Sequence, residues 1–325
     1  MRTVFIVNPK AGKGSNIQKF VDEIKQTADR LNVDVQVYLT KAVGDAEVFV
    51  RRYCIDFGPA RFVACGGDGT LNEVVNGAYG FDDVEIGVVP MGTGNDFRRN
   101  FKDCGEFTDI EAQIKGSCEK CDVIRYSTQL ENGKKVGCGV NMFNIGFDCN
   151  VADLTARMKK KPFISGSFAY FISIFGMLIK KKGANIAIEL DGDVVHMGPL
   201  LLTSIANGCY CGGGIMSNPL AEIQDGLINV NIVNNVSRRR FIGLLPHYMK
   251  GDFLDLEDID EVVVSPKCRT VVVTPLEGTM KMSIDGEICQ VGRTEFEVLH
   301  NAVNFVVPAK KLTEDAQRDK EHTFA

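Results

Sequence analysis

A glycine-rich, acidic stretch follows directly after an apolar run early in the chain. Residues 62–64 read Phe-Val-Ala and residues 65–73 read Cys-Gly-Gly-Asp-Gly-Thr-Leu-Asn-Glu. The apolar run predicts a buried strand, and the apolar spacing after Thr70 predicts a helix. Glycines let the backbone approach a bulky ligand, and the N–H groups and dipole at a helix start favour an anion. Because Asp68 would repel a bare phosphate, we predict a metal-bound phosphate here rather than a plain turn.

The predicted phosphate loop runs from Gly66 to Asn72. Its members are Gly66, Gly67, Asp68, Gly69, Thr70, Leu71 and Asn72. We expect Gly67 to have a positive φ, so that a β-branched residue there would both strain the turn and occupy the space of the phosphate.

Two further polar loops follow apolar runs and support a ligand. The run at residues 3–7 ends at Asn8-Pro9-Lys10-Ala11-Gly12-Lys13, and the run at residues 86–89 ends at Pro90-Met91-Gly92-Thr93-Gly94-Asn95-Asp96-Phe97. Loops at the carboxyl ends of parallel strands share one edge of the sheet, where ligands bind. The first loop has neither the spacing nor the Lys-Ser/Thr ending of a P-loop, so only the three loops together make the signal strong.

Composition bounds the class of protein. The chain has 325 residues, of which 45% are hydrophobic and 24% charged, with a net charge of −5. This length predicts two domains, and the negative charge argues against a nucleic-acid partner. The chain opens in a strand-like run without a signal peptide, and its eleven cysteines lie scattered in apolar contexts, so we expect a cytoplasmic protein with reduced thiols. Cys118 and Cys121 form a CxxC without a second pair, so no zinc site is expected.

The pattern of predicted secondary structure changes near residue 125. Residues 1–125 alternate strand-like and helix-like runs, which predicts an α/β domain with a doubly wound, mostly parallel sheet. Residues 126–312 are rich in short β-like runs, including one at 138–145, and Asn132-Gly133, Asp191-Gly192 and Asp285-Gly286 mark tight turns. They predict a C-terminal antiparallel β-sandwich whose last part packs back on the first domain. Residues 313–325 are expected to form a polar tail.

One nearly uncharged segment, Phe163–Ile179, lies between lysine triplets at 159–161 and 180–182. It is short for a membrane span of about 20 residues and contains several serines and glycines. A buried helix is the favoured interpretation, with an interfacial membrane-contact helix as the alternative.

The ordered set of motifs resembles the diacylglycerol kinase catalytic family, which includes bacterial soluble lipid kinases and the sphingosine and ceramide kinases. The resemblance covers nearly the whole chain. In the first half it rests on the three loops, and in the second on Asn207-Gly208, the triplet 212–214, Pro219-Leu220-Ala221, Asp225-Gly226-Leu227 and Asp285-Gly286-Glu287. It implies an N-terminal nucleotide domain, a C-terminal β-sandwich, and ATP- and Mg²⁺-dependent phosphorylation of a lipid hydroxyl at a membrane surface.

The resemblance also implies roles for single residues. It implies ATP contacts for Asn8, Lys13, Thr40, the Gly66–Asn72 loop, Gly92, Thr93 and Asn95. It implies that Asp68 and Asp96 serve the magnesium of the nucleotide, and that Glu222, Asp225 and the carbonyl of Leu227 hold a further magnesium. The candidate catalytic carboxylates are Glu287, as proton acceptor, together with Asp68 and Asp225. Asp122 and Lys13 are expected to join a charge network around Glu287.

Some alternatives stay open. The position of Glu222 varies within the family, so metal binding there is open, and the third loop continues Phe-Arg-Arg where many members have Ala after Phe. NAD kinase shares the Gly-Gly-Asp-Gly-Thr loop, and a nucleotide-sensing regulator without turnover is a second alternative. Diacylglycerol is the favoured acceptor, although the sequence names no lipid. Peripheral contact with the inner membrane surface is expected, and a homodimer is left open.

Overall fold

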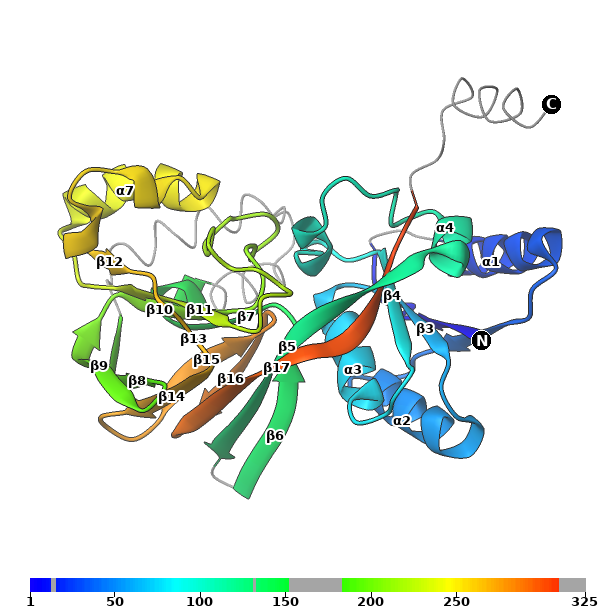
Figure 1. Ribbon diagram of the computed structural model, residues 1–325, viewed down its shortest axis with the longest axis horizontal. Coiled ribbons are helices and arrows are strands. Elements are labelled where there is room, and N and C mark those ends of the chain that lie inside the picture. Colours follow the sequence, from blue (N-terminus) through cyan, green and yellow to red (C-terminus); the bar gives the residue numbers. More distant parts are fainter. Residues whose placement is uncertain (13–15, 131–132, 152–182, 310–325) are drawn as a thin grey trace.

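The computed structural model describes residues 1–12, 16–130, 133–151 and 183–309. Lys13 and the Phe163–Ile179 segment therefore lie outside the described residues. The fold class expected from the sequence, an α/β unit followed by an antiparallel β-sandwich, is confirmed (Figure 1). None of the described helices is long and apolar enough to cross a membrane.

A large mixed sheet runs through both halves of the molecule. Among the described residues it has ten strands, in the order β2-β1-β3-β4-β17-β14-β8-β9, with β5 paired to β17 and β6 paired to β5. These strands are β1 (Thr3–Val7), β2 (Val35–Leu39), β3 (Arg61–Gly66), β4 (Glu85–Pro90), β5 (Ser117–Leu130), β6 (Gly133–Gly139), β8 (Ala184–Leu190), β9 (Asp193–Leu200), β14 (Thr270–Pro275) and β17 (Thr294–Val307).

The first four strands are parallel, and helices cover both faces of this part of the sheet. Apolar side chains on both faces of β1 require cover on both sides. Val4 and Ile6 face one core, while Phe5 and Val7 face the other. The first core contains side chains of α2 and α3, and the second contains side chains of α1 and α4. The helices are α1 (Ile17–Leu31), α2 (Asp45–Phe57), α3 (Asp68–Ala78) and α4 (Ile110–Lys115).

A second sheet packs on the far half of the first. Its seven described strands are β7 (Met142–Gly146), β10 (Leu202–Ala206), β11 (Ile228–Val233), β12 (Val263–Val264), β13 (Lys267–Cys268), β15 (Met280–Ile284) and β16 (Glu287–Val291). Buried apolar side chains of both sheets, such as Phe143, Ile188 and Phe296, form the core between them. The helix α7 (Arg238–Lys250) and the 3₁₀ turns η2 (Phe253–Asp255) and η3 (Ile259–Glu261) belong to this half, and η1 (Phe97–Asn100) belongs to the first.

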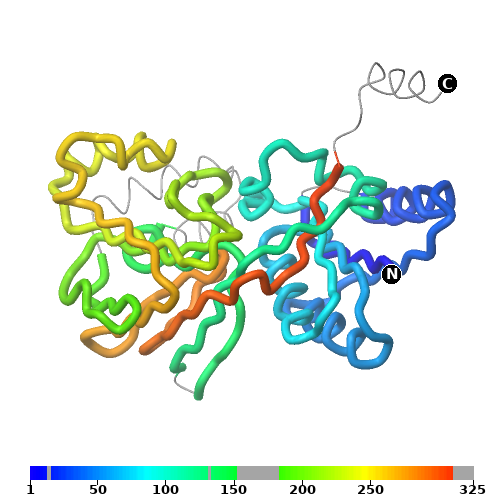
Figure 2. The backbone as a smooth tube through the Cα atoms, viewed as in Figure 1, coloured from blue at the N-terminus to red at the C-terminus, as the bar shows by residue number. Residues whose placement is uncertain are grey.

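Two long strands connect the halves. β5 and β17 pair antiparallel from Thr128↔Thr294 to Ser117↔Val307, with an irregularity between Leu299 and Val303. The end of β17 also pairs parallel with β4, so the last described strand returns to the first half of the chain (Figures 1 and 2). The sequence predicts that the last part of the chain packs back on the first domain, but it does not predict one sheet that continues through both halves. The domain boundary near residue 125 stays a prediction.

The apolar run at 138–145 does not form the single strand expected. It divides into β6 and β7, which belong to different sheets. The carboxylate of Asp285 accepts hydrogen bonds from the N–H groups of Val140, Asn141 and Met142 at 2.7–2.9 Å. These donors therefore bond to a side chain instead of a neighbouring strand, and the ladder breaks there. The expected tight turns at Asp191-Gly192 and Asp285-Gly286 do form, as two-residue hairpins with positive φ at both positions.

Candidate active site at the carboxyl ends of the parallel strands

The three predicted loops meet at one edge of the parallel strands. The side-chain amide of Asn8, after β1, donates to the hydroxyl of Thr70 in the first turn of α3, at 3.2 Å. Thr40, after β2, donates its backbone N–H to Val7 at 2.9 Å. The third loop reaches the second where Gly92 donates its N–H to the carbonyl of Gly66, at 3.2 Å. The structure thus brings together the residues predicted to contact ATP, apart from Lys13, which lies outside the described residues.

Gly67 and Gly92 allow the second and third loops to touch. A Cβ added to Gly92 would lie 2.5 Å from the Cα of Gly67, and one added to Gly67 would lie 3.3 Å from the Cα of Gly92. The expected positive φ at Gly67 is wrong, because its φ is −97° and its backbone is extended. Close approach of two backbones, not left-handed geometry, explains glycine at these positions.

The start of α3 presents backbone N–H groups at this edge. Gly67 is the N-cap, and no described side chain caps the helix there. The N–H groups of Thr70 and Leu71 bond to the carbonyl of Gly67, and the Leu71 side chain is buried in the core. An uncapped helix start of this kind suits phosphate oxygens, and the N–H groups of Asp68 and Gly69 precede the two that bond to Gly67.

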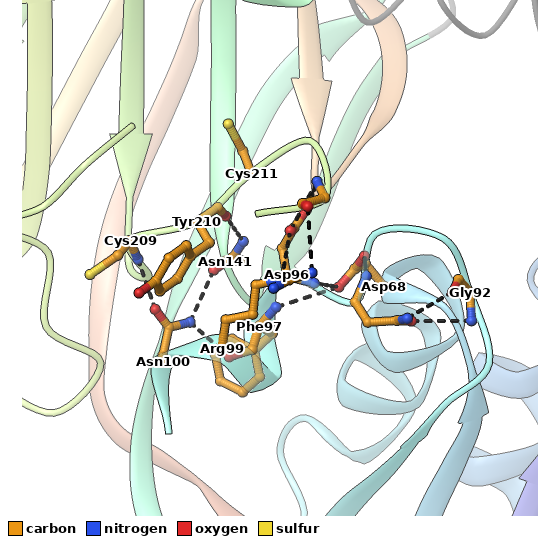
Figure 3. Close-up of polar contacts among 12 residues, drawn as sticks. Asp68, Gly92, Asp96, Phe97, Arg99, Asn100, Asn141, Cys209, Tyr210 and Cys211 are labelled. Carbon is orange, nitrogen blue, oxygen red and sulfur yellow. Dashed lines mark hydrogen bonds and ion pairs between the residues drawn. The ribbon is translucent and has the colours of Figure 1, made fainter. Parts of the chain in front are cut away.

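The Asp68 carboxylate connects the second loop to the third. It accepts hydrogen bonds from the backbone N–H groups of Asn95 and Asp96, both at 2.7 Å (Figure 3). Asn95 closes the same loop on itself, since its side chain exchanges hydrogen bonds with the backbone of Gly92 at 2.7 and 3.1 Å. Asp68 therefore fixes the position of Asp96, and Thr93 lies exposed at the tip of this loop.

The Asp96 carboxylate reaches into the second half of the chain. Its two oxygens accept the N–H of Gly213 at 2.9 and 3.0 Å, and the Arg99 guanidinium lies 3.5 Å away. The three glycines 212–214 all have positive φ, which explains why this turn needs glycine. Burial, and then the nearby charge of Asp68, raise the pKa of Asp96 to about 6.

The two aspartates face a common point. A Cβ added to Gly94 would lie 2.7 Å from Oδ2 of Asp68 and 3.3 Å from Oδ2 of Asp96. Magnesium typically takes one or two carboxylates together with substrate phosphates, so two converging carboxylates supply the kind of ligand that it prefers. Asp68 and Asp96 are therefore the residues that would hold the magnesium of a bound nucleotide, with Arg99 beside Asp96.

Glu287 lies across from this edge. It is the first residue of β16, directly after the Asp285-Gly286 turn, and it is exposed. A Cβ added to Gly69 would lie 3.5 Å from Oε1 of Glu287, so the carboxylate lies beside the first turn of α3. The position of Glu287 follows from Asp285, whose carboxylate accepts a 2.8 Å hydrogen bond from the side-chain amide of Asn72 in α3. Enclosure of the carboxylate raises the pKa of Asp285, and its backbone donors oppose that shift.

The residues predicted to hold a second magnesium do not fit one. The ammonium group of Lys267 lies 2.7 Å from Oε1 of Glu222 and 2.8 Å from Oδ2 of Asp225. The other oxygen of Asp225 accepts the N–H of Leu227 at 2.9 Å. A lysine therefore takes up the carboxylates that would bind the ion, and no group of three or more His, Cys, Asp or Glu suited to a metal occurs among the described residues.

Asp122 is paired away from Glu287. Its buried carboxylate accepts hydrogen bonds from the ring of His300, the N–H of Asn301 and the N–H of Gly226, at 2.7–2.9 Å. These contacts hold the irregular part of β17 against the loop before β11. None of the described partners of Asp122 is Glu287, so the expected charge network around Glu287 does not include Asp122. Cys118 and Cys121 lie on β5, one exposed and the other buried, because residues three apart on a strand face opposite sides.

Sequence reasoning missed several side chains that organise the site. Asn100 and Asn141 lie close together, and Asn100 accepts the N–H of Cys209 at 2.8 Å (Figure 3). Arg99, three residues after Asp96, was noted only as a departure from the family pattern. Its spacing on a helical turn was the one available signal that it would face Asp96. Lys267 belongs to none of the sequence motifs, so no signal in the sequence pointed to it.

Comparison with known proteins agrees with this geometry. Residues 2–126 match the diacylglycerol kinase catalytic domain, and residues 141–307 match the YegS C-terminal NAD kinase beta sandwich-like domain. The diacylglycerol kinase of Bacillus subtilis (strain 168) is 24% identical over 95% of this chain and 97% of its own length. That of Staphylococcus carnosus (strain TM300) is 27% identical over 88% of each chain.

Solved structures show the same fold. A crystal structure of a diacylglycerol kinase from Bacillus anthracis str. Sterne superposes with a TM-score of 0.65 at 19% identity, covering 94% of this chain and 96% of that one. A yeast NADH kinase complexed with NADH gives a TM-score of 0.52 at 13% identity, over 100% of this chain and 87% of its own. The order of the two matched domains, together with the loops that meet at Asp68 and Asp96, places the chain in the diacylglycerol kinase family, whose members are phosphotransferases.

Proposed function

We propose that the protein transfers the γ-phosphoryl group of ATP to the hydroxyl of diacylglycerol, giving phosphatidic acid and ADP. The observation that carries the proposal is the position of Glu287 beside Gly69, at the uncapped start of α3. A phosphate on those N–H groups would lie next to a carboxylate that comes from the other half of the chain. That is the arrangement a kinase needs between its donor phosphate and a base for the acceptor.

The chemistry assigned to these residues is simple. The acceptor hydroxyl gives its proton to the Glu287 carboxylate as its oxygen bonds to the γ-phosphorus, and the bond from that phosphorus to the ADP oxygen breaks. Phosphoryl transfer depends mainly on positioning and on neutralising charge. The α3 N–H groups would supply part of that neutralisation, and a magnesium ion held by Asp68 and Asp96 would supply the rest. Asp68 is the weaker candidate for the base, because both of its oxygens already accept backbone N–H groups.

A small apolar cavity lies under α7, within a hydrophobic core of the second half. It is lined by Phe147, Leu201, Leu202, Val233, Val236, Phe241, Leu244, Leu245, Tyr248, Met249 and other apolar side chains, and its carboxylate is that of Asp148. About 40 Å³ is open, which is too little for an acyl chain, so the acceptor's chains are expected to stay in the bilayer. We therefore also propose peripheral contact with the cytoplasmic membrane surface.

Incubation with γ-labelled ATP and a panel of acceptors tests the proposal. The panel contains diacylglycerol, sphingosine, ceramide, undecaprenol and NAD, each with and without Mg²⁺. Labelled phosphatidic acid as the main product is the expected result. Labelled NADP would favour an NAD kinase, and tight ATP binding without any labelled product would favour a regulator. Either outcome would overturn diacylglycerol as the acceptor.

A further inference from the structure

A lysine lies among the residues that the family resemblance assigns to a second magnesium. Lys267 belongs to β13, which pairs antiparallel with β11, so that Lys267 is opposite Asn229. This register brings its side chain to the loop of residues 222–227, which leads into β11. The Lys267 ammonium contacts Glu222 at 2.7 Å and Asp225 at 2.8 Å.

The ammonium lies where a shared cation would have to lie. Its contacts with Glu222 and Asp225 use one oxygen of each carboxylate, and the remaining Asp225 oxygen accepts the Leu227 N–H. The Lys267 and Asp225 side chains are only 27% and 20% exposed, so solvent screens this contact less than an ordinary surface ion pair. A divalent ion bound to the same oxygens would meet the positive charge of Lys267 at contact distance.

The other side of the 222–227 loop is held without any ion. Asp122 accepts the N–H of Gly226 at 2.7 Å and donates its own N–H to the carbonyl of Ile223 at 2.7 Å. The loop is therefore fixed from one side by the buried Asp122 and from the other by Lys267. Neither contact needs a metal.

We propose that the ammonium group of Lys267 takes the place of a divalent ion in the 222–227 loop, so that this loop binds no divalent ion while Lys267 is present. Magnesium would then be needed only with the nucleotide. This inference does not depend on which alcohol accepts the phosphoryl group. Loss of the ammonium should leave the Glu222 and Asp225 carboxylates without their shared cation and create a weak cation site with a Kd of about 10⁻⁴ to 10⁻³ M.

Mn²⁺ binding to the nucleotide-free wild-type protein is the first test, measured by electron paramagnetic resonance against Asp225→Asn. Any Mn²⁺ held by Asp68 and Asp96 is common to both proteins and cancels in the comparison. We expect equal stoichiometry. An ion that the wild type binds and the Asp225→Asn variant loses would overturn the proposal, and this comparison needs no substitution of Lys267.

The second test adds Lys267→Ala and Lys267→Gln, the latter retaining most of the side-chain volume in case the shorter residue impairs folding. Each should gain one Mn²⁺ and a Tm that rises by about 2 to 4 °C in 10 mM Mg²⁺. The double variant Lys267→Ala/Asp225→Asn should lose both gains. Lys250→Ala, which breaks the 2.7 Å ion pair with Asp252, is the matched control and should gain neither. If neither Lys267 variant gains an ion, Lys267 is an ordinary ion-pair partner and the replacement is refuted.

Discussion

The side-chain amide of Asn72 donates a 2.8 Å hydrogen bond to the carboxylate of Asp285, which lies 213 residues further along the chain. Asn72 is in the second turn of α3, and Asp285 opens the turn that presents Glu287. One bond therefore ties the helix that carries the phosphate loop to the hairpin that carries the proposed base. The separation of donor phosphate and base would then depend on this contact, in which Asn72, itself a predicted ATP contact, uses its side-chain amide to hold Asp285.

Asn72→Ala should lower kcat more than it weakens ATP binding. Without the amide, the hairpin loses the hydrogen bond that ties Asp285 to α3, and a displacement of Glu287 by about 1 Å is enough to cost about 10²-fold in rate. Steady-state turnover and ATP affinity by isothermal titration measure the two effects separately. Asn304→Ala is the matched control, because the Asn304 amide donates to the carbonyl of Val84, just before the start of β4 and therefore away from the Asp285 turn. Equal losses in both variants would assign the effect to a general loss of stability instead.

Glu287→Gln should leave nucleotide binding nearly intact and lower kcat by about 10²-fold to 10⁴-fold, as expected for a lost general base. Asp68→Asn should instead weaken nucleotide binding, since both Asp68 oxygens hold the third loop. Glu277→Gln, an exposed glutamate beyond β14, is the control and should behave as the wild type. Wild-type turnover by Glu287→Gln would move the role of base to Asp68.

Gly67→Val should reduce ATP affinity by about 10-fold or more, which corresponds to about 1.4 kcal/mol. The reason is contact, not backbone strain, because a Cβ at Gly67 is already 3.3 Å from the Cα of Gly92 and a branched side chain would push the two loops apart. Gly243→Val is the control, since a Cβ added to Gly243 meets nothing within 4 Å. Circular dichroism checks that both variants fold. Unchanged affinity in folded Gly67→Val would remove the phosphate-loop assignment.

The parts of the site predicted best from the sequence are those that depend on local pattern. Apolar runs followed by glycine-rich loops predicted β1, β3 and β4. Because these strands are parallel, the loops after them lie at one edge of the sheet. The failures involve distant partners. Nothing near Asp285 in the sequence indicates that its carboxylate would bind the N–H groups of residues 140–142 and end a strand there. Lys267 was missed for the same reason, because its partners come from a strand register that no local pattern encodes.

Asp148 should make stability fall as pH rises from about 4 to 6. Burial raises the pKa of this carboxyl from 3.8 to about 6, although the hydroxyl of Tyr248 donates to it at 2.6 Å. Between those pH values the folded state binds more protons than the unfolded state, so the free energy of unfolding decreases as the proton is lost, by up to about 3 kcal/mol in total. Asp148→Asn keeps an acceptor for Tyr248 and should be more stable than the wild type above pH 6, by urea denaturation. Asp82→Asn, at an exposed aspartate, should follow the wild-type pH dependence. Parallel curves for the wild type and Asp148→Asn would show that the carboxyl does not titrate in this range.

Reversible contact with anionic membranes should depend on the lysine triplets at 159–161 and 180–182, which lie outside the described residues. A diacylglycerol hydroxyl lies at the headgroup level, so the proposed reaction needs the protein at the surface. Each lysine near an anionic bilayer contributes about 1 kcal/mol. Co-sedimentation with anionic and neutral vesicles compares the wild type with Lys→Glu changes at Lys159, Lys160, Lys180 and Lys181. The matched control carries the same charge change at four exposed lysines elsewhere, Lys25, Lys41, Lys134 and Lys135. We expect loss of anionic binding only in the first variant at low salt. Equal loss in both would reduce the effect to net charge, and equal sedimentation of all three proteins would exclude the lysine triplets as the docking surface.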